Sequence, residues 1–176
     1  MDQNKNWTNW QYYNPNTIAD LVPAMGAKTY TRSDGVRITI NSPTEIISSG
    51  MNLWDCFAGP GNTSSSKNYC EVNTPGYLQI SFSVPQTLVQ CYFYNYHTGS
   101  TSAPISLQGS NNGSDFSNIS SLTIPASNTV QNQFVISNPV TYSYFRIYFT
   151  SNLGNYSSTV GMIRNLVLRG YSNPNG

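Results

Sequence analysis

The sequence predicts an all-β protein, an antiparallel β-sandwich of jelly-roll type with about eight strands. Polar and apolar residues alternate with a period of two from about residue 36 onward, and β-branched and aromatic residues are enriched in the alternating stretches. Gly, Pro and Asn separate these stretches at short intervals, as turn residues do between strands. The chain of 176 residues is long enough for one domain of this size, so we expect a single sandwich.

Eight stretches carry the strand pattern, and they follow one another along most of the chain. They are Val36–Ile40, Tyr77–Val84, Leu88–Tyr94, Pro104–Gln108, Ile119–Ile124, Gln133–Ile136, Tyr144–Thr150 and Met162–Arg169. No long segment has a helical period. Ile18–Pro23 is expected to form one short turn of helix, which Pro23 ends because proline cannot continue it.

The N-terminal segment differs in character from the rest of the chain. Four aromatic residues, Trp7, Trp10, Tyr12 and Tyr13, stand in a polar stretch without an alternating pattern. We therefore expect residues 1–30 to form an N-terminal arm, residues 31–171 the sandwich and residues 172–176 a C-terminal tail. Two interpretations of the aromatic cluster stay open: the rings cover one edge of the sandwich, or the arm docks on another protein in a large assembly.

The composition limits the partners that the surface can recognise. Charged residues make up 9% of the chain, the formal net charge is +1, and the 8 basic residues are scattered singly. A nucleic-acid-binding surface needs clustered Lys and Arg, so nucleic acid is not expected as a partner. No apolar run approaches the ~18 residues of a membrane span, and the first residues lack the apolar core of a signal peptide. Neutral polar groups must cover the surface, which suits hydrogen-bonded partners.

Catalytic motifs are absent from the sequence. The 7 acidic residues share no recognisable catalytic arrangement, His97 is the single imidazole, and neither a nucleophile elbow nor a phosphate-binding loop occurs. We therefore expect a protein that is not an enzyme and that needs no cofactor.

Three cysteines give an odd count, which disulfide-rich scaffolds avoid. Cys91 is in phase with Val89 and Phe93 and is expected to behave as a small buried hydrophobic residue. Cys56 and Cys70 flank a loop rich in Gly, Ser and Asn. They could pair in an oxidising compartment, but free thiols are expected for a chain without an export signal. One His and no C-x-x-C motif argue against a zinc site.

Several motifs occur in an ordered set between about residues 45 and 170. In chain order they are Trp54-Asp55-Cys56, the strand Pro75–Phe82, the strand and Gly/Asn/Ser turn Pro104–Phe116, the strand Tyr142–Phe149 and the final strand Val160–Gly170. Together they resemble the discoidin domain, also called the coagulation-factor type C domain, of the galactose-binding-like superfamily. Cys56 departs from the pattern, because the family has Gly after the aromatic-Asp pair. Within the resemblance, Phe116 is expected to fold over the sheet, and Arg146 to have a structural role.

The resemblance implies a ligand site on loops at one end of the sandwich. One loop brings Tyr96 and His97, and the loop between the last two strands brings Asn155 and Tyr156. An aromatic ring can stack on the C–H face of a sugar while polar groups bond to its hydroxyls. The alternative is that these are ordinary loop residues in a chain rich in Tyr and Asn.

The resemblance also raises the question of a structural Ca²⁺, which many sugar-binding relatives hold near the aromatic-Asp-Gly loop. Asp55 matches the first ligand, but Asn165 stands where the family often has Glu in the last strand. Ca²⁺ prefers six to eight oxygen ligands and usually more than one carboxylate. The alternative is that Asp55 caps its own turn.

These observations lead to a non-catalytic binding or structural protein. We expect a virion component, such as a minor capsid, fibre or tail protein, that uses a discoidin-like sandwich to bind neighbouring subunits or host glycans. The alternative is a stand-alone or secreted carbohydrate-binding lectin, located outside the cell or at its surface. An adhesion module from a longer chain is a third interpretation. A domain of this fold can have many roles, so the step from fold to role is an analogy.

Overall fold

The computed structural model describes residues 18–46, 52–57, 69–95, 103–125, 129–151 and 160–171. Every pairing between the strands of this part of the chain is antiparallel. The elements are β1 (Ala19–Asp20), β2 (Thr29–Thr31), β3 (Arg37–Asn41), the 3₁₀ helix η2 (Leu53–Phe57), β4 (Tyr69–Asn73), β5 (Gly76–Asn95), β6 (Ala103–Ser110), β7 (Ser117–Ile124), β8 (Gln131–Phe134), β9 (Val140–Phe149) and β10 (Val160–Tyr171).

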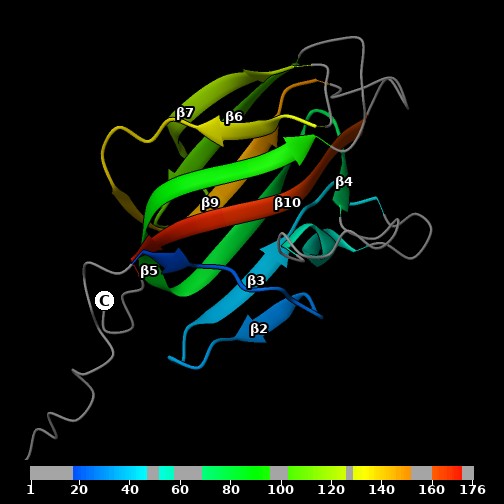
Figure 1. The fold of residues 1–176 in the computed structure, drawn as a ribbon. Coiled ribbons are helices and arrows are strands. Elements are labelled where there is room, and N and C mark those ends of the chain that lie inside the picture. The colour runs from blue at the N-terminus through cyan, green and yellow to red at the C-terminus, as the bar shows by residue number, and fades with distance from the viewer. Residues whose placement is uncertain are drawn as a thin grey trace, which may run out of the picture.

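Strand β5 belongs to both layers of the sandwich (Figure 1). Its first half pairs with β3 and β9, and β6, β7 and β2 extend that layer. Its second half pairs with β8 and β10, and β10 pairs in turn with β4 and β1. The register between β5 and β9 shifts between Ser81 and Gln86, where β5 changes layer. Both ends of β5, Gly76 and Asn95, therefore lie at one end of the sandwich, and its bend lies at the other.

The core fills the space between the two layers. Alternate residues of the central strands point inward, as Leu78 and Ile80 do from β5 and as Phe145 and Ile147 do from β9. Aromatic rings of neighbouring strands pack against each other within each layer: the Phe93 and Phe134 centroids are 5.8 Å apart, and those of Phe82 and Phe145 are 6.2 Å apart in an edge-to-face arrangement. The predicted antiparallel sandwich is confirmed, because period-two alternation with one buried face is what such layers require.

The eight predicted strands all correspond to observed strands, with one difference in continuity. Tyr77–Val84 and Leu88–Tyr94 were expected as two strands and form the single strand β5. Pro85 lies at the bend, where the β9 ladder is interrupted, so the missing N–H of proline costs no regular pairing there.

The secondary structure of residues 18–30 differs from the one expected from the sequence. The helical turn expected over Ile18–Pro23 is wrong: β1 pairs Ala19 with Gly170 and Asp20 with Arg169. β2 begins at Thr29 and pairs with β3. Within the range expected for the arm, Ala19–Asp20 and Thr29–Tyr30 therefore pair with strands of the sandwich, and the division of the chain at residue 30 stays a prediction. The aromatic residues Trp7, Trp10, Tyr12 and Tyr13, and the tail 172–176, lie outside the described residues.

Among the helices that the described residues form, none has the length and apolar character needed to cross a lipid bilayer.

Candidate ligand-binding site

The two segments predicted to carry the ligand site start and finish at the same end of the sandwich. β5 ends at Asn95, which is paired with Ile163 near the start of β10. β9 ends at Phe149, which is paired with Ile105 near the start of β6. The segments 96–102 and 152–159 are therefore attached to neighbouring strand ends. Their predicted site residues, Tyr96, His97, Asn155 and Tyr156, lie outside the described residues.

Polar residues of β5 and β10 lie at this end of the sandwich, next to the two segments. Asn95 is buried, with 1% of its surface exposed. The guanidinium of Arg164 lies over the ring of Tyr94 at 5.8 Å from its centroid. A cation above an aromatic face is attracted by the ring quadrupole, which holds the two strands in register here. The strand ends to which the two segments are attached are therefore held in place by these contacts.

Asn165 lies in a β-bulge of β10, next to Arg164. Arg164 pairs with Tyr94 and Val167 with Tyr92, so two residues of β10 oppose one residue of β5. Asn165 has a φ of 48°, in the left-handed region that Asn tolerates better than most residues. Its Oδ1 is buried and has no hydrogen-bond partner among the described residues. An amide oxygen in that state is available to a donor or a cation.

Asp55, the residue expected to hold Ca²⁺, lies in the 3₁₀ helix η2. The carboxylate of Asp55 accepts a hydrogen bond from the backbone N–H of Asn52 at 2.7 Å, while the Asp55 N–H donates to the Asn52 carbonyl at 3.1 Å. This reciprocal pair caps the start of η2. The described part of the chain contains no group of three or more His, Cys, Asp or Glu residues that could hold a metal. The loop that follows η2, residues 58–68, lies outside the described residues, so a Ca²⁺ site at Asp55 stays a prediction.

The structural role expected for Arg146 is confirmed. Its Nε donates a hydrogen bond to Gln108 Oε1 at 2.6 Å, and its guanidinium lies 3.8 Å from the centroid of the Phe116 ring. Tyr77 and Tyr148 flank it at 5.0 and 5.6 Å. Burial lowers the pKa of Arg146 from its ordinary value, but a guanidinium stays charged at neutral pH. Arg146 thus fastens the turn after β6 onto the outer face of the sheet.

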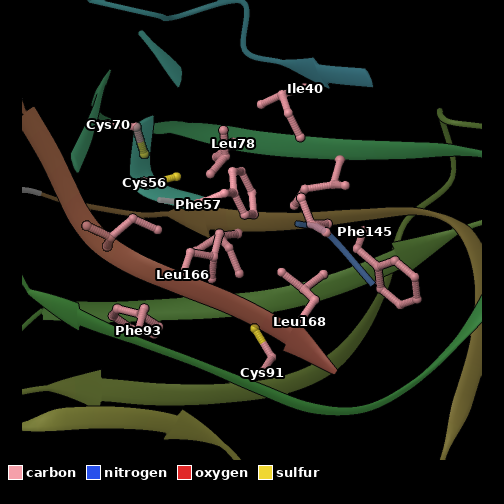
Figure 2. Close-up of a cluster of buried hydrophobic side chains, with 14 of the residues drawn as sticks. Ile40, Cys56, Phe57, Cys70, Leu78, Cys91, Phe93, Phe145, Leu166 and Leu168 are labelled. Atoms are coloured by element: carbon pink, nitrogen blue, oxygen red, sulfur yellow. The ribbon is translucent and has the colours of Figure 1, made fainter. Parts of the chain in front are cut away.

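The three thiols are buried in the core, where Cys91 behaves as the small hydrophobic residue that the sequence predicted. Burial raises the pKa of the Cys91 thiol. Cys56 of η2 and Cys70 of β4 are neighbours, and their sulfur atoms face each other (Figure 2). Burial, and then the hydrogen bond with Cys70, raise the pKa of Cys56.

The sequence analysis missed an open hollow beside β1, at the opposite end from the loop attachments. Tyr30, Arg32 and Asp34 line it, together with Asp20 of β1. The signal that could have found it is the Arg-Ser-Asp-Gly turn between two short alternating stretches, Thr29–Thr31 and Arg37–Asn41.

No protein-family model matches the chain, and no curated protein sequence matches it significantly. Solved structures do match. The family 32 carbohydrate-binding module of AlyQ in complex with 4,5-unsaturated mannuronic acid has a TM-score of 0.57 at 16% identity, covering 81% of this chain and 98% of the other. The C-terminal domain of a chitobiase from Bacteroides fragilis has a TM-score of 0.58 at 16% identity, covering 82% and 99%. The family 32 module of NanJ from C. perfringens in complex with galactose has a TM-score of 0.58 at 11% identity, covering 81% and 98%.

The fold is that of a discoidin-like domain. The discoidin-like sandwich matches almost the whole length of these modules, so the predicted galactose-binding-like architecture is confirmed at the level of the fold. In a further match, truncated AlyQ, a family 32 carbohydrate-binding module shares its chain with an alginate lyase domain, and our chain covers 32% of that longer chain.

Proposed function

We propose that this protein is a non-catalytic carbohydrate-binding module that binds glycans at the loop end of its sandwich. The observation that carries the proposal is the match in fold to complete carbohydrate-binding modules, at TM-scores of 0.57 and 0.58. Two of the matched modules hold a sugar, 4,5-unsaturated mannuronic acid in one and galactose in the other. The low-charge surface, with its formal net charge of +1, agrees with a hydrogen-bonded, uncharged ligand.

Within this proposal, Tyr96 and His97 supply rings for stacking on a sugar, and Asn155 and Tyr156 supply hydrogen bonds to its hydroxyls. The pairing of Asn95 with Ile163, and of Phe149 with Ile105, supports the assignment because it attaches both segments to adjacent strand ends. A site formed by two segments can hold a sugar between them, as ligand clefts usually do.

The expectation of a virion component finds no support in the comparisons, and neither do virion partners. The alternative from the sequence, a carbohydrate-binding module or lectin, therefore becomes the proposal. An extracellular location belongs to the same proposal.

A glycan array with the full chain tests this function. We expect binding to a restricted set of glycans, with loss of binding in Tyr96→Ala and Asn155→Ala. Asn118→Ala is the matched control, because Asn118 is an exposed Asn of β7 whose partner is Ser121 in the same strand. Repeating the array with added Ca²⁺ and with EDTA shows whether the affinity depends on a metal. A folded protein that binds no glycan would contradict the proposal.

A further inference from the structure

The outer face of the layer formed by β5, β9 and β6 carries a group of polar and aromatic side chains around one arginine. Alternate residues of β9 are buried in the core, so Arg146 and Tyr148 point to the outer face. The strand register places Gln79 and Gln108 on either side of Arg146, and Tyr77 beside Tyr148. All five residues are partly exposed. We call these five residues the sheet-face cluster.

The positive charge of Arg146 has no carboxylate beside it. Within the described part of the chain, the ion pairs involve other arginines, and the acceptor that Arg146 bonds to is the neutral amide of Gln108. Burial lowers the pKa of Arg146, which is the expected direction where packing removes water from a cation. An anion bound next to this guanidinium would therefore supply the opposite charge that the fold leaves out.

The guanidinium of Arg146 is held in one orientation and keeps one end for a ligand. Its Nε donates to Gln108 Oε1 at 2.6 Å, and the Phe116 ring lies 3.8 Å away, measured to the ring centroid. The Nη1 and Nη2 atoms carry four N–H groups that reach no acceptor among the described residues. A carboxylate can accept from both of these nitrogen atoms at once, because the guanidinium is planar and forked.

Two tyrosine rings beside the guanidinium add a surface for a sugar ring. The ring centroids of Tyr77 and Tyr148 lie 5.0 and 5.6 Å from the central carbon of the Arg146 guanidinium. The amide of Gln79, also in the cluster, has no hydrogen-bond partner among the described residues. A hexuronic acid has its carboxylate directly on the pyranose ring, so one residue can contact a tyrosine through its C–H face and the arginine through its carboxylate. A simple anion lacks the ring, and a neutral sugar lacks the charge.

We propose that the sheet-face cluster binds a uronate residue of an acidic glycan, with the carboxylate on Nη1 and Nη2 of Arg146 and the sugar ring against Tyr77 and Tyr148. This inference rests on the proposed function, since it assumes a glycan ligand, and it adds an acidic residue to the ligand bound at the loop end. The two places are continuous, because Tyr148 precedes Phe149, the last residue of β9, at the loop end. A glycan chain bound between the loops can therefore continue onto this face.

Titration of the ¹⁵N-labelled full chain at constant ionic strength, followed by amide chemical shifts, tests the cluster. The probes are methyl α-D-galactopyranosiduronate, its neutral counterpart methyl α-D-galactopyranoside, and acetate, each at up to about 50 mM, which reaches millimolar dissociation constants. We expect saturable shifts at Tyr77, Gln79, Arg146 and Tyr148 with the uronate, and binding at least about tenfold weaker with the galactoside. Acetate that binds as tightly as the uronate would indicate a simple anion site and overturn the proposal, and so would equal affinity for the galactoside.

A charge variant tests the role of Arg146 without removing it. Gln79 lies directly across from Arg146 on the neighbouring strand, so Gln79→Glu places a carboxylate beside the guanidinium. Opposite charges in this position favour the folded sheet, so the variant should fold, and it should weaken uronate binding at least about tenfold. Gln133→Glu is the matched control, since it makes the same change at an exposed Gln of β8 in the other layer, and it should bind within about twofold. An unchanged affinity in Gln79→Glu would overturn the proposal.

Separate results distinguish this site from the loop site. Uronate shifts at residues 77–79 and 146–148 that persist in Tyr96→Ala support the sheet-face cluster, even if the loop site fails. Saturable shifts confined to residues 96–102 and 152–159 overturn the cluster and leave the proposed function standing.

Discussion

Gly170 occupies a point where two backbones approach too closely for any side chain. A Cβ at this position would lie 1.8 Å from the carbonyl oxygen of Thr87, and the pairing of β10 with β5 shifts register just before it. We expect Gly170→Ala to lower the free energy of unfolding by about 2–3 kcal/mol, because the strands must separate to admit the methyl group. Chemical denaturation measures this change.

Gly26→Ala is the matched control, since no atom lies within 4 Å of a Cβ there. Its effect should stay within about 0.5 kcal/mol, as for most exposed substitutions. Equal stabilities for the two variants would show that β10 does not approach β5 as the structure describes.

Cys56 and Cys70 are placed for a disulfide that the reduced structure does not contain. The Cys56 and Cys70 side chains are hydrogen bonded to each other. For Cys91, burial is the cause of the raised pKa. When the unfolded protein is refolded with glutathione disulfide at mildly alkaline pH, so that the thiols are accessible, we expect the two thiols to lose two protons and two electrons and form one bond, while the oxidant becomes two glutathione thiols. Closing a loop of about 15 residues should raise the melting temperature by about 6–12 °C.

Peptide mapping without reductant measures this cross-link. Cys91→Ala should still form it, and Cys70→Ala should not. Glutathione attached to Cys56 or Cys70, in place of the cross-link, would contradict the prediction.

The Cys91 thiol also makes stability depend on alkaline pH. Burial raises its pKa in the folded state, so the folded protein keeps this proton after the unfolded chain has lost it above about pH 8.5. The unfolded state then binds fewer protons, and the free energy of unfolding falls as pH rises. We expect the wild type to lose up to about 1.4 kcal/mol per pH unit more than Cys91→Ala. Denaturation curves between pH 8 and 10 measure the two slopes, and parallel slopes would contradict the assignment.

At the scale of elements, the turn between β6 and β7 is fastened by Phe116. Its ring covers the Arg146 guanidinium at 3.8 Å, and Arg146 is bonded to Gln108 of β6. We expect Phe116→Ala to destabilise the protein by about 2 kcal/mol and to speed amide exchange in β7. Phe116→Tyr keeps the ring and should change stability by less than about 0.5 kcal/mol. If the two variants behave alike, the ring does not hold the turn.

The elements also show how far the sequence could predict the fold. Alternation identified the strands that bury one face, and Cys91 was placed correctly for the same reason. The alternating pattern could not identify β4, because its residues from Tyr69 to Val72 are all buried. It could not find β1 either, because two residues of strand carry no period and depend on β10 for their pairing. Such elements are determined by tertiary contacts and not by local pattern.

The candidate site was less predictable than the fold. The residues Tyr96, His97, Asn155 and Tyr156 came from a resemblance, and they stay a prediction. The hollow at Tyr30 escaped notice because Arg32, which lines it, is held in place by Gln86 and by the Leu21 carbonyl. Those partners are 54 and 11 residues away in sequence, a distance that no local motif reveals.

For the whole molecule, β10 runs from one end of the sandwich to the other. It begins with Val160 beside Asn73, at the loop end, and it reaches Arg169 beside Asp20, at the opposite end (Figure 1). Nine residues of strand span roughly 30 Å. Residues around Asp20 and Tyr30 therefore lie far from the glycan site proposed at the loop end.

This separation predicts which changes weaken retention on an immobilised polysaccharide. We expect Tyr96→Ala, at the loop end, to lower the affinity about tenfold, because a ring that stacks on the sugar is lost. Tyr30→Ala removes an exposed ring at the opposite end and should leave retention within about twofold. Affinity chromatography with both variants measures this difference, and equal losses of retention would contradict the placement of the glycan site at the loop end.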